Sequence, residues 1–153
     1  MTFQEMGLSD AVLRALEEAG FSEPTPIQEQ VIPLQIGHHD VIGQAQTGTG
    51  KTAAFGIPLI ERLSPRQRDD GKHTTDALIL TPTRELASQV SEELRKIGLH
   101  KSLSVVTIYG GVSIEQQVRT LRHRTNIIVG TPGRVLDHLS RGTINISGVR
   151  HFV

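Results

Sequence analysis

Short apolar runs alternate with helical patterns along most of this chain. Runs that predict buried strands cover residues 41–45, 77–80, 103–109 and 127–129, and a further run begins at Val149. Between these runs, apolar residues recur at three- and four-residue spacing, which indicates amphipathic helices. This alternation predicts an α/β fold, doubly wound, with a largely parallel sheet and helices on both faces.

Capping residues predict where the helices begin. Helix starts are predicted directly after Ser9, Thr25, Thr83, Ser113 and Thr131. Gln28 and Gln116 each fall three residues after a cap, a spacing that fits a capping box. Pro58 should kink or shorten the helix after the first strand, and the polar stretch 64–75 predicts an exposed loop.

Length and charge restrict the possible functions. The 153 residues have the size of one domain, and 16 basic residues balance 16 acidic ones. Any contact with nucleic acid must therefore be local, because no net charge attracts the chain to RNA or a membrane. No apolar run is long enough to span a bilayer, and we expect a cytoplasmic protein without a membrane partner.

Metal-ligand patterns are absent from the sequence. The chain has no cysteine, which excludes disulfides and thiolate metal sites. The seven histidines show no His-x-x-x-His pair, and most are expected on the solvated surface.

The stretch from residue 45 to 52 is typical of a phosphate-binding loop. Gly48 and Gly50 allow a tight turn with positive φ, so that backbone N–H groups at a helix start can face a phosphate. Lys51 would reach the β- and γ-phosphates of a nucleotide, and the Thr52 hydroxyl would bind Mg²⁺. The predicted phosphate site comprises Ala45, Gln46, Thr47, Gly48, Thr49, Gly50, Lys51 and Thr52. The alternative is an ordinary glycine-rich turn with an exposed lysine.

With these segments placed, the sequence resembles the first RecA-like domain of DEAD-box RNA helicases over essentially its whole length. Residues 21–28 resemble the adenine-recognising Q motif, Phe3 matches the aromatic residue that precedes it, and residues 45–52 resemble motif I. The resemblance implies that ATP or ADP binds with Mg²⁺. It also implies that Phe21 stacks on adenine, that the Gln28 amide pairs with its edge, and that Lys51 and Thr52 serve catalysis.

Three further motifs imply RNA as a partner. Residues 82–87 resemble motif Ia, Gly110 and Gly111 the paired glycines after it, and residues 131–134 motif Ib. The resemblance implies that they contact the sugar-phosphate backbone of a single strand. The implied RNA-binding residues are Pro82, Thr83, Arg84, Gly110, Gly111, Thr131, Pro132, Gly133 and Arg134.

The Asp-Glu-Ala-Asp motif of this family would come after Val153, so the sequence predicts a RecA-like domain over residues 1–153 that is incomplete at its carboxyl end. The second RecA-like domain would be a missing partner. We expect an ATP-dependent RNA helicase as the parent, and a fragment that binds adenine nucleotide without hydrolysing it.

One alternative is another P-loop NTPase class, such as a kinase or a GTPase, but no Asn-Lys-x-Asp run that would recognise guanine is present. The other is a non-catalytic nucleotide- or RNA-binding module. The RNA substrate and the oligomeric state stay open.

Overall fold

The computed structural model describes residues 1–65 and 74–153. Its contacts group the chain into two units, residues 1–64 with 93–102 and residues 65–92 with 103–153. Most of the loop predicted over residues 64–75 lies outside the described residues. Residues 1–64 with 93–102 are called the helical unit, and residues 65–92 with 103–153 the sheet unit.

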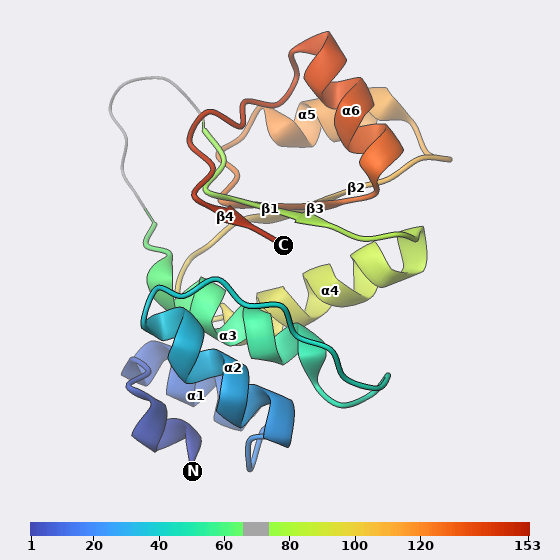
Figure 1. Cartoon of the computed structure of the whole chain (residues 1–153). Coiled ribbons are helices and arrows are strands. Elements are labelled where there is room, and N and C mark those ends of the chain that lie inside the picture. Colours follow the sequence, from blue (N-terminus) through green and yellow to red (C-terminus); the bar gives the residue numbers. More distant parts are fainter. Residues whose placement is uncertain (66–73) are drawn as a thin grey trace. The chain divides into compact units, whose positions relative to one another are not determined.

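The sheet unit contains four parallel strands in the order β2-β3-β1-β4 (Figure 1). Their bounds are Ala77–Leu80 for β1, Val105–Ile108 for β2, Ile127–Gly130 for β3 and His151–Phe152 for β4. Each of the first three lies within or next to a predicted apolar run, and β4 forms in the run that begins at Val149. β3 is buried along its whole length, as expected for a strand with a neighbour on each side.

Helices cover both faces of this sheet. On one face, α5 (Ile114–Leu121) and α6 (Pro132–Arg141) lie over the strands (Figure 1), and Val135 joins Leu78, Val106 and Ile128 in one apolar core. On the other face, α4 (Arg84–Ile97) is anchored where the Thr107 hydroxyl donates to Ser91 Oγ at 2.6 Å. The predicted fold class, α/β with a parallel sheet between helices, is confirmed.

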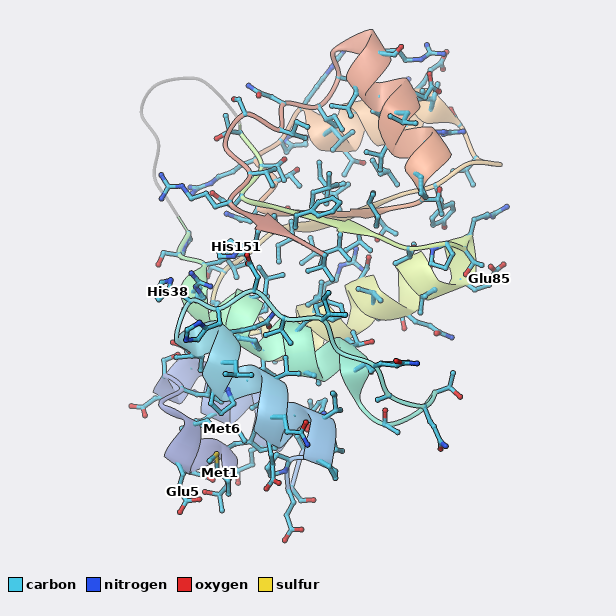
Figure 2. All side chains as sticks on the ribbon, in the orientation of Figure 1. Met1, Glu5, Met6, His38, Glu85 and His151 are labelled. Carbon is cyan, nitrogen blue, oxygen red and sulfur yellow. The ribbon has the colours of Figure 1, made fainter. Side chains whose placement is uncertain are left out.

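The helical unit contains η1 (Phe3–Met6), α1 (Asp10–Glu18), α2 (Pro26–Ile36), α3 (Lys51–Arg62) and the last part of α4. η1 buries Phe3 and Met6, the latter labelled in Figure 2. α3 continues through Pro58 to Arg62, so this proline does not shorten the helix. Among the described residues, no helix is both long and apolar enough to cross a membrane.

Two local predictions are wrong. Residues 41–45, all of them described, form no strand, and Ile42 is fully exposed. A strand needs a ladder partner, and this run offers only two β-branched residues before Gly43. At α5, Ser113 occupies the cap position but makes no side-chain capping hydrogen bond, so the capping box predicted with Gln116 does not form.

Candidate nucleotide site and nucleic-acid interface

The predicted phosphate loop leads directly into the first turn of α3. Gly48 has φ of 78° and Gly50, immediately before the helix, has φ of 83°, a left-handed conformation that favours glycine. The Thr49 hydroxyl donates to the Gln46 carbonyl at 2.7 Å and closes the loop on itself. The backbone N–H groups of the first turn have no partner within the helix, and the helix dipole adds positive charge at this end. These features agree with the predicted anion site, which stays a prediction, although no strand precedes the loop.

Lys51 and Thr52 occupy the first turn of α3. The exposed Lys51 ammonium donates to the Ala45 carbonyl at 2.6 Å and so spans the loop from its last part to its first. An ammonium has three donors, and two remain for a phosphate. Thr52 is half-buried beside it. This placement agrees with the predicted roles of both residues, which stay predictions.

Gln28 connects α2 to the phosphate loop. Its side chain is only 2% exposed. Oε1 accepts from the Thr25 backbone N–H at 3.0 Å, and Nε2 donates to the Gly50 carbonyl at 3.1 Å. The Thr25 hydroxyl adds a second link by donating to the Thr49 carbonyl at 2.9 Å. The predicted capping box at this helix start is thus present. One lone pair on Oε1 and one hydrogen on Nε2 remain for a base edge, and the pairing with adenine stays a prediction.

Phe21 belongs to a small aromatic cluster in the same unit. Its half-buried ring meets that of Phe3 edge to face, with centroids 6.4 Å apart and an interplanar angle of 83°. Both rings line a cleft of about 430 Å³ together with residues of α1. The match between Phe3 and the aromatic position upstream of the Q motif therefore has a structural basis, because Phe3 supports Phe21. Stacking of Phe21 on a base stays a prediction.

In the sheet unit, the three predicted RNA-binding motifs follow neighbouring strands. Thr83, Gly110 and Thr131 come just after β1, β2 and β3, whose carboxyl ends lie side by side because the sheet order is β2-β3-β1. The Thr83 hydroxyl accepts from the Leu86 N–H at 3.2 Å and caps α4, as predicted. Thr131 precedes Pro132 at the start of α6 and makes no side-chain capping hydrogen bond. The motifs are thus brought to one edge of the sheet.

Both arginines predicted to bind RNA, Arg84 and Arg134, lie against the turn that follows β2. The Arg84 guanidinium lies over the Tyr109 ring, 5.0 Å from its centroid. A Cβ on Gly111 would lie 2.6 Å from Arg84 Nη1, so only glycine leaves room for this arrangement. Arg134 Nη1 donates to the Val112 carbonyl at 3.1 Å. The paired glycines thus lie between two cations that come from different helices.

The sequence analysis missed two buried polar residues next to Arg134. Gln117 Oε1 accepts from Arg134 Nη1 at 3.1 Å and lies 2.9 Å from His138 Nε2, while Gln117 Nε2 donates to the Tyr109 carbonyl at 2.8 Å. His138 is fully buried, unlike the solvated position expected for most of the histidines. Burial lowers the pKa of His138, and the positive charge of Arg134 lowers that pKa further. The ring is therefore neutral at neutral pH.

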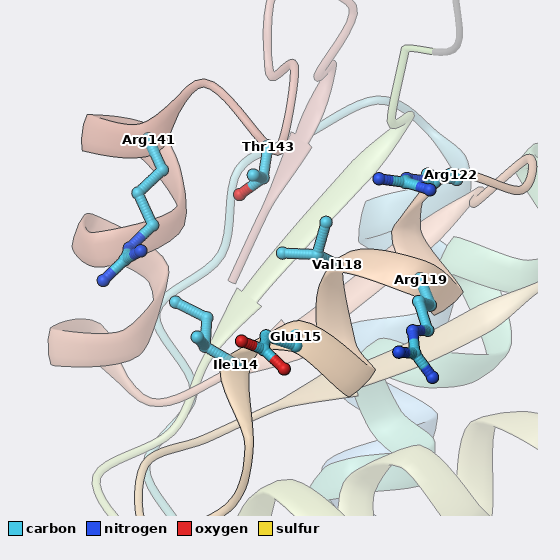
Figure 3. Close-up of a pocket in the computed structure, with 7 residues that line it drawn as sticks. All are labelled: Ile114, Glu115, Val118, Arg119, Arg122, Arg141 and Thr143. Atoms are coloured by element: carbon cyan, nitrogen blue, oxygen red, sulfur yellow. The ribbon is translucent and has the colours of Figure 1, made fainter.

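One hollow of the sheet unit contains none of the predicted site residues. It is an open groove of about 440 Å³ beside α5, lined mainly by apolar atoms of Ile114 and Val118 and edged by three arginines (Figure 3). Within the described part of the chain, no group of three or more histidines and carboxylates could hold a metal ion.

Comparisons with known proteins agree with the motifs. Residues 25–153 match the DEAD/DEAH box helicase family. The chain is 54% identical over 152 residues to the DEAD-box ATP-dependent RNA helicase CshA of Geobacillus kaustophilus, covering 99% of this chain and 32% of that protein. It is also 54% identical over 153 residues to CshA of Bacillus subtilis, covering 100% of this chain and 30% of that protein.

A solved structure gives the same result for the fold. The crystal structure of a DEAD box protein from the hyperthermophile Methanococcus jannaschii superposes with a TM-score of 0.89 at 46% identity, and covers 99% of this chain and 40% of that chain. This chain spans less than a third of the length of the two curated relatives. By sequence and by fold, the chain belongs to the DEAD/DEAH box helicase family.

Proposed function

We propose that this chain binds an adenine nucleotide, ATP or ADP, at the loop of residues 45–52. The observation that carries the proposal is the pair of hydrogen bonds by which Gln28 joins α2 to the Gly50 carbonyl and to the Thr25 N–H. They fix a side-chain amide, which can both donate and accept, to the phosphate loop itself. A nucleotide on this loop would thus have its phosphates at the start of α3 and its base near Gln28 and Phe21.

Mg²⁺ would enter with the nucleotide. Thr52 offers one hydroxyl ligand, and phosphate oxygens and water would supply most of the others, as is usual for this ion. The two free donors of the Lys51 ammonium would neutralise charge on the β- and γ-phosphates. This chain supplies the part of a nucleotide site that positions the phosphates and compensates their charge.

The second part of the proposal is that the sheet unit binds the backbone of single-stranded RNA. Arg84 and Arg134 supply positive charge, the start of α6 supplies backbone N–H groups, and the Thr131 hydroxyl is not engaged in capping. All these groups lie at the carboxyl edge of the sheet, where open α/β sheets bind ligands. We infer that the whole protein is an ATP-dependent RNA helicase, because both curated relatives carry that name.

Arg84→Ala and Arg134→Ala should each weaken binding of every single-stranded RNA sequence to the same extent. Each variant removes one backbone-neutralising charge, so the dependence of affinity on salt should become less steep by about one unit of slope per charge. Fluorescence anisotropy with oligouridine and oligoadenosine over a salt series measures both effects. A variant that changed the preference between the two sequences while keeping the overall affinity would contradict backbone recognition.

The polypeptide of residues 1–153 should bind nucleotide but release no phosphate. Hydrolysis needs a carboxylate that holds Mg²⁺ and a group that positions the attacking water, and an arginine finger alone contributes about 10³–10⁵ in rate. Three of the described strands, β1, β2 and β3, continue into Thr81, Tyr109 and Thr131 and not into a carboxylate.

A phosphate-release assay tests this prediction, with and without RNA, beside a longer polypeptide that includes the rest of the protein. The short chain should show nucleotide binding by calorimetry and no turnover above background. RNA-stimulated release by the short chain, abolished in Lys51→Ala, would show that a catalytic carboxylate lies within these residues.

A further inference from the structure

Gln117 lies at the centre of a buried hydrogen-bond network around Arg134. Its side chain is 8% exposed on α5 and uses both ends of its amide. Nε2 donates to the Tyr109 carbonyl at 2.8 Å, while Oε1 lies 3.1 Å from Arg134 Nη1 and 2.9 Å from His138 Nε2. One side chain thus connects the turn after β2, the start of α6 and the interior of the unit.

The chemistry of the partners fixes the orientation of this amide. Reversing it would set Oε1 against the Tyr109 carbonyl and Nε2 against the Arg134 guanidinium, which has no acceptor. Because Oε1 can only accept, His138 must carry its proton on Nε2. His138 Nδ1, without a proton, can then accept from the Thr143 hydroxyl, 2.7 Å away, and the His138 carbonyl oxygen at 3.1 Å is the alternative acceptor for the same hydrogen. A neutral ring fits the contacts of both ring nitrogens, in agreement with the direction of the pKa shift of His138.

The network holds one edge of Arg134 and leaves the other edge available. The two hydrogens of Nη1 are used by the Val112 carbonyl and Gln117 Oε1. A Cβ on Gly110 would lie 4.0 Å from Nη2, which places the second nitrogen beside the paired glycines. Within the described part of the chain, Nη2 and Nε make no hydrogen bond, and the residue is partly exposed.

We propose that Gln117 is a positioning residue that holds the Arg134 guanidinium and the turn of residues 109–112 in one fixed arrangement for a nucleic-acid phosphate. The inference rests on the proposed RNA-binding function and deepens it. A guanidinium that is already immobilised loses less side-chain freedom when it binds. Gln117 itself need not touch RNA, since its amide is buried and hydrogen-bonded at both ends.

Gln117→Met tests the proposal, because methionine has a similar length and cannot make the three hydrogen bonds. Gln116→Met is the matched control, since Gln116 is the exposed neighbour of the same type on α5. The first measurement needs no RNA. In wild type and in Gln116→Met, NMR should resolve separate Nη1 and Nη2 signals for Arg134, because its guanidinium cannot rotate freely. In Gln117→Met these signals should merge.

The second measurement is the affinity for single-stranded oligouridine. Gln117→Met should weaken binding about three- to tenfold in the wild-type background and should have no effect in the Arg134→Ala background. A purely structural role would give the same loss in both backgrounds and would overturn the proposal. Separate Nη1 and Nη2 signals for Arg134 in Gln117→Met would also overturn the proposal. Merged signals in the wild type would overturn it too, and this test remains even if the variant fails to fold.

The experiments distinguish a failure of the proposed RNA binding from a failure of the proposed role of Gln117. If wild type and Arg134→Ala bind oligouridine equally weakly, the proposed RNA function is wrong. The NMR signals then still decide whether Gln117 immobilises Arg134.

Discussion

Lys51→Ala should lower the affinity of the chain for Mg·ADP about ten- to hundredfold, because it removes a charge-assisted contact to phosphate of about 1.5–3 kcal/mol. The fold should survive. Lys51 is exposed at the first position of α3, and alanine is a good helix former there. The lost hydrogen bond to the Ala45 carbonyl is also exposed, so its removal should change the free energy of unfolding little. Isothermal titration calorimetry measures the affinity, and urea denaturation measures the stability.

Lys96→Ala is the matched control for this experiment. Lys96 is exposed in the last turn of α4 within the same unit, so the variant removes the same charge away from the loop. It should bind Mg·ADP as wild type does. If Lys51→Ala unfolds the chain, or binds nucleotide as tightly as Lys96→Ala, then Lys51 is a structural residue.

Gly50→Ala should destabilise the nucleotide-free chain by about 2–5 kcal/mol. A left-handed φ of 83° costs a non-glycine residue about 1–2 kcal/mol. In addition, a Cβ at this position would overlap Gln28 Nε2 and lie 3.3 Å from Thr25 Oγ1. Gln28 cannot keep its bond to the Gly50 carbonyl and also move away, and leaving its buried amide unpaired costs about 1–3 kcal/mol more.

Gly48→Ala separates these two contributions. Gly48 has a similar φ of 78°, but a Cβ there would meet nothing within 4 Å. This variant should therefore lose only the backbone contribution of about 1–2 kcal/mol. Urea denaturation of both variants without nucleotide gives the comparison. Equal losses in the two would mean that the contact between Gln28 and the loop contributes nothing to stability.

Much of the fold could be predicted from local patterns. The strands β1 and β3 are continuous apolar runs, and β2 is interrupted only by Thr107. Such runs are typical of parallel strands that helices cover on both faces. Helix starts at Thr25, Thr83 and Thr131 followed from capping residues and from proline at the first helical position.

The strand predicted over residues 41–45 shows the limit of local patterns. Whether Val41 and Ile42 form a strand depends on a ladder partner, which is a property of the tertiary structure. The positive φ predicted for Gly48 and Gly50 in the adjacent loop is present, because this conformation is favoured by the residue type itself. The backbone conformation of these glycines could thus be predicted from the sequence, whereas the strand pairing of residues 41–45 could not.

Two interpretations of Gln28 were open in the sequence, a helix cap and an adenine-binding amide. The structure confirms the cap and adds a bond to the Gly50 carbonyl that no local pattern indicates, because the two residues are far apart in sequence. The second interpretation stays a prediction.

The sequence gives only a weak indication that Gln117 and His138 form a buried hydrogen-bond network. Gln117 lies three residues after Ile114 and four before Leu121, and so falls on the apolar face of α5. His138 follows the buried Val135 by three residues on α6. A polar residue on an apolar helix face predicts a buried hydrogen bond, but only the fold reveals that Gln117 contacts both Arg134 and His138.

A calorimetric titration of the chain with Mg·ADP and with Mg·GDP, repeated for Gln28→Ala, shows whether the loop and Gln28 form an adenine-nucleotide site. Guanine has an acceptor where adenine has a donor, so a paired Gln28 amide should favour ADP by about 1–3 kcal/mol, which is about five- to hundredfold in affinity. Gln28→Ala should lose this preference as well as stability. If Gln28 is only a cap, the variant will be less stable with an unchanged ratio of affinities. Equal affinities of the wild-type chain for ADP and GDP would contradict an adenine-specific site.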